Sequence, residues 1–140
     1  MQKLYTAAAA FAVLGLVAGV FYREFTRAND FMGETQLSTL HTHLLVLGMF
    51  SFLIQMALNA VFKLDEHKLF NAFFWTYTVG LVWMTTMMVV KGVFQVLKEG
   101  QEYPAALAGV SGLGHIIMAA AIFMLFRILH KQVRKFQLQN

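Results

Sequence analysis

The stretch LHTHLLVLGMFSFLIQMALNAVF, residues 40–62, decides the fold of this chain. It carries no Asp, Glu, Lys or Arg, and roughly 20 apolar residues are enough to cross the hydrocarbon core of a membrane as a helix. The stretch therefore predicts a membrane-spanning helix. Its two histidines, His41 and His43, stand out because ionisable side chains are costly at membrane depth and usually serve a function there.

Three further apolar segments have a similar length, at residues 4–22, 70–90 and 105–129. The chain of 140 residues is 59% hydrophobic and only 13% charged, which leaves too little polar surface to enclose a water-soluble globule. A helix satisfies its own backbone polar groups in lipid, whereas an open sheet does not. We therefore expect an all-α membrane protein, one domain over residues 1–140 with four transmembrane helices. Residues 4–22 are longer than the apolar part of a usual signal peptide, so we expect them to be retained.

The distribution of Lys and Arg predicts the orientation, because cytoplasmic segments are enriched in these residues. Seven of the eleven Lys and Arg fall at the two chain ends and in the loop at residues 63–68: Lys3, Lys63, Lys68, Arg127, Lys131, Arg134 and Lys135. Arg23, Arg27, Lys91 and Lys98 fall on the other side. Both termini should be cytoplasmic, in the inner membrane of a bacterium, and the lipid bilayer is the first partner. The basic residues lie at helix ends and form no stripe, so no nucleic-acid partner is expected.

His41 and His43 should point to different neighbours. At about 100° per residue they lie about 160° apart on one helix, so a straight helix cannot bring both to one metal ion. The His41 face continues through Gly48, where another helix could approach closely. Thr39, one turn before His43, could hydrogen-bond the second ring nitrogen of that histidine, as the partners of metal-bound histidines commonly do.

A third histidine, His115, lies inside the last apolar segment. It follows Pro104 by eleven residues, or roughly 16 Å of helix, and this places it level with the other two. Ala108, Gly112 and Ala119 share its stripe. Small residues at this spacing let helices pack closely, and they would equally leave room for a flat macrocycle. Ser111, one turn away, could satisfy the ring N–H of His115.

Met84 and Met88 come level with the histidines on the third helix. Methionine is an axial ligand of heme iron and a soft copper ligand, although most methionines in apolar chains only fill space. Three basic side chains on the outer side, Lys91, Arg23 and Arg27, could pair with heme propionates. Lys91 could instead extend its ammonium to the membrane interface. We expect His67 and His130 to be solvated.

Several classes of site are excluded by the sequence. The chain has no cysteine, which rules out disulfides, thiolate metal sites and cysteine nucleophiles. It has no Gly-rich phosphate loop, no HExxH and no serine elbow. No reaction can therefore be assigned, and whether the protein is an enzyme stays open.

Three stretches carry a resemblance over nearly the full length of the chain: residues 21–50, FYREFTRANDFMGETQLSTLHTHLLVLGMF; residues 84–96, MTTMMVVKGVFQV; and residues 109–122, GVSGLGHIIMAAAI. They resemble a family of small bacterial membrane proteins known only as a domain of unknown function. The resemblance implies four helices and a shared set of histidines, and it brings no activity with it.

His41-Thr42-His43 is also similar to the His-x-His of the heme-copper oxidase catalytic subunit, in which two histidines on opposite faces of one helix each ligate a different heme. That subunit has three groups of four helices, so the resemblance implies that this chain could form a homotrimer of twelve helices. His41 and His43 of adjacent protomers would then meet at each boundary. The chain has no evident copper-site histidine pair and no tyrosine-histidine motif, which argues against oxygen reduction.

Together these observations favour an integral-membrane protein that binds heme b, with histidine axial ligands in the outer half of the membrane. Two imidazoles would suit electron transfer, and one would leave iron open to a diatomic gas. We expect His41 and His43 from neighbouring protomers as ligands, and His43 with His115 inside one protomer is the competing pair. The alternatives are copper or zinc bound by the same histidines and a methionine, or an assembly partner of a membrane complex that binds no metal. The redox partner cannot be named.

Overall fold

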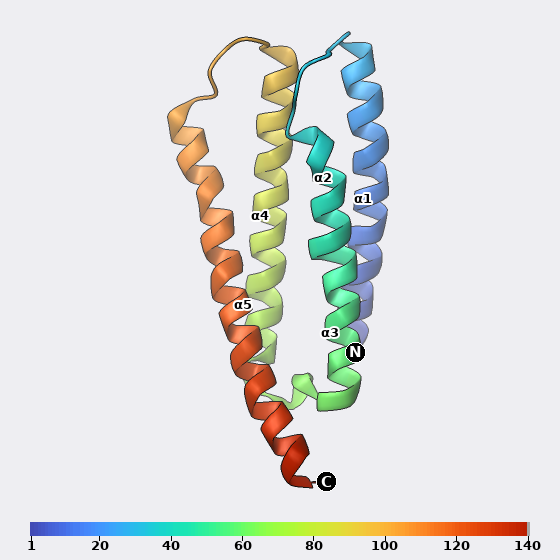
Figure 1. The fold of residues 1–140 in the computed structure, drawn as a ribbon, viewed down its shortest axis with the longest axis vertical. Helices are drawn as coiled ribbons and strands as arrows, with labels where there is room; N and C mark the ends of the chain where they lie inside the picture. The colour runs from blue at the N-terminus through green and yellow to red at the C-terminus, as the bar shows by residue number, and fades with distance from the viewer. Residues whose placement is uncertain (140) are drawn as a thin grey trace.

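A computed structural model describes residues 1–139, and these residues are helical apart from short connections (Figure 1). The elements are α1 (Gln2–Ala28), α2 (Leu37–His43), the π-helix η1 (Leu44–Phe50), α3 (Ser51–Phe62), the 3-10 turn η2 (Leu64–Glu66), α4 (Phe70–Leu97) and α5 (Ala105–Gln139). α2, η1 and α3 follow one another without a break and form a single rod.

Four helical rods in the described residues are long and apolar enough to cross a membrane, which confirms the predicted fold class. Each rod extends beyond the apolar segment that predicted it. α1 runs to Ala28 and α4 to Leu97, because hydropathy marks only the part of a helix that suits lipid. The polar residues that follow contain no proline, and Pro104 is the only proline in the chain, so the helical hydrogen bonding continues through them.

The rods form two antiparallel pairs, α1 with the α2–η1–α3 rod and α4 with α5, and the contact of α2 with α4 joins the pairs (Figure 1). Met1, η2 and the last turns of α5 lie at one end, which we call the terminal end. The connections at residues 29–36 and 98–104 lie at the other, which we call the loop end.

The π-helix is the main irregularity, and α4 supplies the side chain that stabilises it. The Tyr77 hydroxyl donates to the Leu47 carbonyl at 2.8 Å. Ser51 Oγ lies 2.8 Å from the same hydroxyl. Tyr77 has one proton and a carbonyl can only accept, so Ser51 donates in this second bond. Gln55 Nε2 in turn donates to Ser51 Oγ at 3.1 Å, which makes a buried chain of hydrogen bonds between the two pairs of rods.

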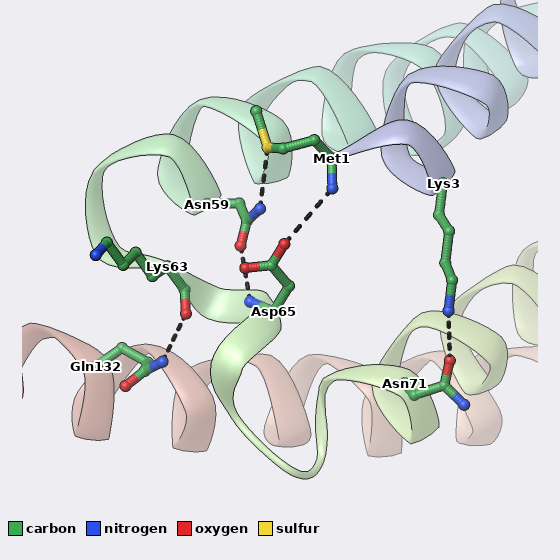
Figure 2. Close-up of polar contacts among 7 residues, drawn as sticks. All are labelled: Met1, Lys3, Asn59, Lys63, Asp65, Asn71 and Gln132. Carbon is green, nitrogen blue, oxygen red and sulfur yellow. Dashed lines mark hydrogen bonds and ion pairs between the residues drawn. The ribbon is translucent and has the colours of Figure 1, made fainter.

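Polar contacts tie the rods together at the terminal end (Figure 2). Asn59 donates from Nδ2 to the Met1 sulfur at 3.0 Å, and its Oδ1 accepts the Asp65 backbone N–H at 2.7 Å. The Met1 ammonium lies 3.6 Å from the Asp65 carboxylate. Gln132 Nε2 donates to the Lys63 carbonyl at 2.6 Å. These contacts hold α1, α3 and α5 to the η2 connection.

Two glycines set the distance between α4 and α5. A Cβ atom at Gly114 would lie 3.0 Å from Met84 Cβ and 3.1 Å from Met84 Cα. On the other helix, a Cβ at Gly80 would lie 2.9 Å from Ile117 Cγ2. Small residues at such positions allow the backbones of membrane helices to approach closely. The glycines therefore fix Met84 beside the turn of α5 that carries His115.

Candidate functional site

A pocket of about 290 Å³ lies between α2, α4 and α5, towards the loop end. It collects residues that are far apart in the sequence and that include most of the predicted ligands. Its lining residues are Gln36, His43, Met84, Met87, Met88, Lys91, Ser111 and His115. The sequence had placed both histidines, Met84 and Met88 at one level and Lys91 nearer the outer end, and all of them line this one cavity.

His43 is held by its own helix. Its Nδ1 lies 2.9 Å from the backbone carbonyl of Thr39. Because a carbonyl can only accept, Nδ1 carries the proton, and Nε2 of the neutral ring keeps a free lone pair. The sequence predicted Thr39 as the partner, but the hydroxyl takes no part, since it donates to the Gln36 carbonyl at 3.3 Å. A hydrogen bond of this kind fixes the tautomer and the orientation of the imidazole ring.

His115 has no such support. It is exposed on α5, and no hydrogen bond reaches its ring from residues 1–139. The predicted bond from the His115 ring N–H to Ser111 Oγ does not form within these residues, and the Ser111 hydroxyl donates to the Leu107 carbonyl at 2.8 Å. A Cβ atom at Gly112, one turn before the histidine, would meet nothing within 4 Å. The stripe of small residues beside His115 thus faces open space, and Gly114 makes the close helix contact.

His41 lies on the opposite side of α2, as the sequence predicted. A Cβ atom at Gly19 of α1 would lie 3.8 Å from His41 Cβ, so this imidazole faces α1. Its Nε2 is 3.4 Å from the Thr42 hydroxyl. Its Nδ1 is buried and has no hydrogen-bond partner within the described part of the chain. One protomer therefore offers His43, and not His41, to the pocket.

The methionines and Lys91 form the wall contributed by α4. Met84 and Met88 are buried, with relative exposures of 5% and 8%. Lys91 stands at the loop end of the pocket, where its Nζ lies 5.6 Å from the centre of the Tyr103 ring. Met87 also belongs to this wall, although no sequence pattern had distinguished it from the other methionines. The pocket thus places thioethers near the imidazoles and a cation at its edge.

Gln36 is a second lining residue that the sequence analysis missed. It precedes α2 and lay outside every apolar segment, so no pattern marked it. Its backbone N–H donates to Gln95 Oε1 at 2.9 Å, which fastens the start of α2 to α4. This bond holds the loop end of the pocket together.

Arg23 and Arg27, predicted as partners of propionates, do not line the pocket. The Arg23 side chain is 76% exposed and its Nε lies 3.6 Å from Glu24. Arg27 is exposed in the last turn of α1. α1 packs against the other side of the α2 rod, so these arginines are kept on the far side of it.

His67 and His130 lie near the terminal end, away from the pocket. Burial, followed by the charges of Lys131, Lys68 and Arg127, lowers the pKa of His67 below its ordinary value. The Leu69 backbone N–H donates to His67 Nδ1 at 3.2 Å, which also suits a neutral ring. His67 is therefore only partly solvated, whereas His130 is exposed, as predicted.

The donor set restricts the chemistry of the pocket. No group of three or more His, Cys, Asp or Glu side chains in the described residues is placed to hold a metal ion. Structural zinc takes four such ligands. A heme iron needs only one or two ligands from the protein, because the porphyrin supplies four nitrogens. Two imidazoles and several thioethers suit that smaller requirement.

Comparison with known proteins identifies the family but no activity. The family described as "Protein of unknown function (DUF2871)" matches residues 1–132. The chain belongs to this family. No curated protein and no solved structure matches the chain, so the resemblance to the heme-copper oxidase subunit finds no support there.

Proposed function

We propose that this protein is a membrane protein that binds heme b in the pocket between α2, α4 and α5. The observation that carries the proposal is the presence of His43 and His115, from two different rods, in the lining of one cavity at membrane depth. His43 and His115 are the proposed axial ligands. This is the pairing within one protomer, and His41 has no place in it because it faces α1.

The size and surroundings of the pocket suit a flat cofactor that is only partly enclosed by one chain. A volume of about 290 Å³ is at the lower limit of roughly 300–1,000 Å³ for small-molecule sites. The part of the cofactor that the pocket does not enclose would lie in the open space beside Gly109 and Gly112, where added Cβ atoms meet nothing within 4 Å. Lys91 at the edge would pair with a propionate. Heme bound there would supply a redox-active iron for electron transfer or for a diatomic gas.

We further propose that the terminal end faces the cytoplasm of a bacterium, in the inner membrane. In support, Met1, η2 and the last turns of α5 share this end, and residues 1–3, 63–68 and 127–135, in and beside these segments, hold seven of the eleven Lys and Arg. A cysteine introduced at Lys68 should react only after inner-side access is given, and one introduced at Asp30 should react from outside.

A homo-oligomer, and a homotrimer by analogy, is part of the same proposal. The exposed His115 and the open stripe at Gly112 favour a second chain over that face, because an imidazole facing lipid is costly. The mass of the protein in mild detergent, measured with its bound heme, tests this point. A monomer with a full complement of heme would refute it.

The direct test is the absorption spectrum of protein purified in detergent from cells supplied with heme. We expect a Soret band, and sharp α and β bands after reduction with dithionite. His43→Ala should abolish most heme binding, whereas His67→Ala and His130→Ala serve as matched controls and should retain it. Folded wild-type protein that shows no Soret band, despite heme in the cells, would refute the proposal.

The methionines favour copper as the second candidate. Met84, Met87 and Met88 line the pocket with the histidines, and thioethers with imidazoles select Cu(I). Elemental analysis of the same preparation separates the candidates. Copper without a Soret band, lost on Met84→Leu, would establish this alternative in place of heme.

A further inference from the structure

The two histidines of the pocket differ in how firmly they are held. The His43 ring is fixed by the hydrogen bond from Nδ1 to the Thr39 carbonyl at 2.9 Å. The His115 ring receives no hydrogen bond from residues 1–139, and the hydroxyl nearest in sequence, that of Ser111, is bonded to Leu107. A hydrogen-bonded imidazole is better oriented and more basic as a ligand than one without such a partner.

The helices that carry the two histidines also differ in how closely they are packed. α2 is packed between α1 and α4, with Leu40 and Leu44 buried on either side of His43. On α5, residues 105–110 are all exposed, and added Cβ atoms at Gly109 and Gly112 would meet nothing within 4 Å. The backbone here is held to α4, since Trp83 Nε1 donates to the Val110 carbonyl at 3.1 Å and Gly114 packs against Met84. The His115 side chain itself has more open space beside it than that of His43.

We propose that His115 is a displaceable ligand, and that the site takes a neutral diatomic gas on the His115 side of the iron while His43 stays bound. This inference rests on the proposed heme site. It selects gas binding from the two uses of heme that the sequence left open. When the gas binds, the bond between iron and His115 breaks and the gas forms a bond in its place, with no net transfer of electrons or protons.

The surroundings of His115 favour such a ligand over a charged or bulky one. The pocket wall beside it consists largely of thioether side chains, with Met84 and Met88 buried. The hydrocarbon around the rods dissolves non-polar gases more readily than water does. An anion would instead have to cross the apolar layer at a large cost in solvation. A small neutral molecule can reach the iron from the membrane itself.

The experiment uses carbon monoxide as the probe and the whole protein, purified with heme and reduced with dithionite. We expect the Soret band to shift when carbon monoxide is added. In the wild type, the observed rate should level off at high carbon monoxide, because release of His115 becomes limiting. In His115→Ala, the rate should rise in proportion to concentration and exceed the wild-type limit at least tenfold. His130→Ala, a change of a histidine away from the pocket, should keep the wild-type levelling.

The other possible outcomes distinguish failure of this inference from failure of the proposed heme site. Reduced wild-type protein with full heme and an unchanged Soret band under carbon monoxide would overturn the inference and leave the heme site intact. Loss of heme from His115→Ala to the same extent as from His43→Ala would also overturn it, since His115 would then be an essential ligand. If His115→Ala fails to fold, the levelling of the wild-type rate still decides whether an internal ligand must leave. Absence of heme from the wild type would instead refute the proposed function.

Discussion

Replacing Tyr77 by phenylalanine should destabilise the protein, because its hydroxyl joins the two pairs of rods at the π-helix. The change removes the donor to the Leu47 carbonyl and the acceptor for Ser51, both at 2.8 Å. Tyr77 is only 3% exposed and both bonds are partly buried, so the freed groups would have little access to solvent. Hydrogen bonds between membrane helices are worth about 0.6 kcal/mol on average and about 1.7 at most. A buried polar group left without a partner costs about 1–3 kcal/mol.

We therefore expect Tyr77→Phe to lower the free energy of unfolding by about 1–2 kcal/mol, which is roughly a fivefold to thirtyfold change in the equilibrium constant. The measurement is reversible unfolding in mixed micelles of a mild detergent and dodecyl sulfate, followed by circular dichroism. Tyr5→Phe is the matched control. Tyr5 is 57% exposed on α1 and its hydroxyl forms no hydrogen bond within the described residues, so its change should stay within about 0.5 kcal/mol.

A double-mutant cycle tests the hydrogen-bond chain itself. Ser51→Ala removes the donor to Tyr77 and the acceptor for Gln55. If the two side chains act together, the combined variant should lose less than the sum of the single variants, by about 0.5–1.5 kcal/mol. Strict additivity, or a Tyr77→Phe effect no larger than that of Tyr5→Phe, would refute the role assigned to Tyr77.

Three further predictions concern the pocket and the terminal end. Gly114→Val should destabilise the α4–α5 contact by about 1–3 kcal/mol and reduce heme content, because even its Cβ would lie 3.0 Å from Met84; Gly112→Ala, at a site with nothing within 4 Å, should leave the stability of that contact unchanged. His41→Ala should retain the wild-type heme content per chain, and loss of heme would restore the model in which adjacent protomers share the ligands. The ring of His67 should titrate by NMR with a pKa below its ordinary value of 6.5, so its contribution to stability is complete above pH 6.5 and is lost as the pH falls through the folded-state pKa. A midpoint at 6.5 or higher would contradict the burial assigned to it.

The sequence predicted the parts of this structure that depend on depth in the membrane. Uniform hydropathy located the four rods, and a rise of about 1.5 Å per residue placed His43, His115 and Met84 at one level. Their meeting in one pocket follows from antiparallel packing of rods of similar length. The opposite directions of His41 and His43 followed from helical periodicity alone.

The parts that were not predicted depend on contacts between rods. The π-helix at Leu44–Phe50 has no pattern in its own residues, since the side chain that satisfies its Leu47 carbonyl belongs to α4. Gly112 and Gly114 are equally small, and the rotation of α5 against α4 decides that Gly114 is the one in contact. Arg23 and Arg27 suited a propionate by their charge and their level in the membrane. They belong to α1, however, which packs on the side of the α2–η1–α3 rod away from the pocket.

The close approach of α4 and α5 at Gly114 has a thermodynamic consequence. Met84 touches Gly114, and His115 is the next residue along the chain, so the contact that closes the pair of helices also shapes the pocket. Any ligand that requires both walls will bind only when the helices are together. By mass action it then stabilises their association by RT ln(1 + [L]/Kd), about 2.7 kcal/mol at a hundredfold excess over Kd. The resistance of α5 to unfolding would thus report how much of the protein carries a ligand in this pocket.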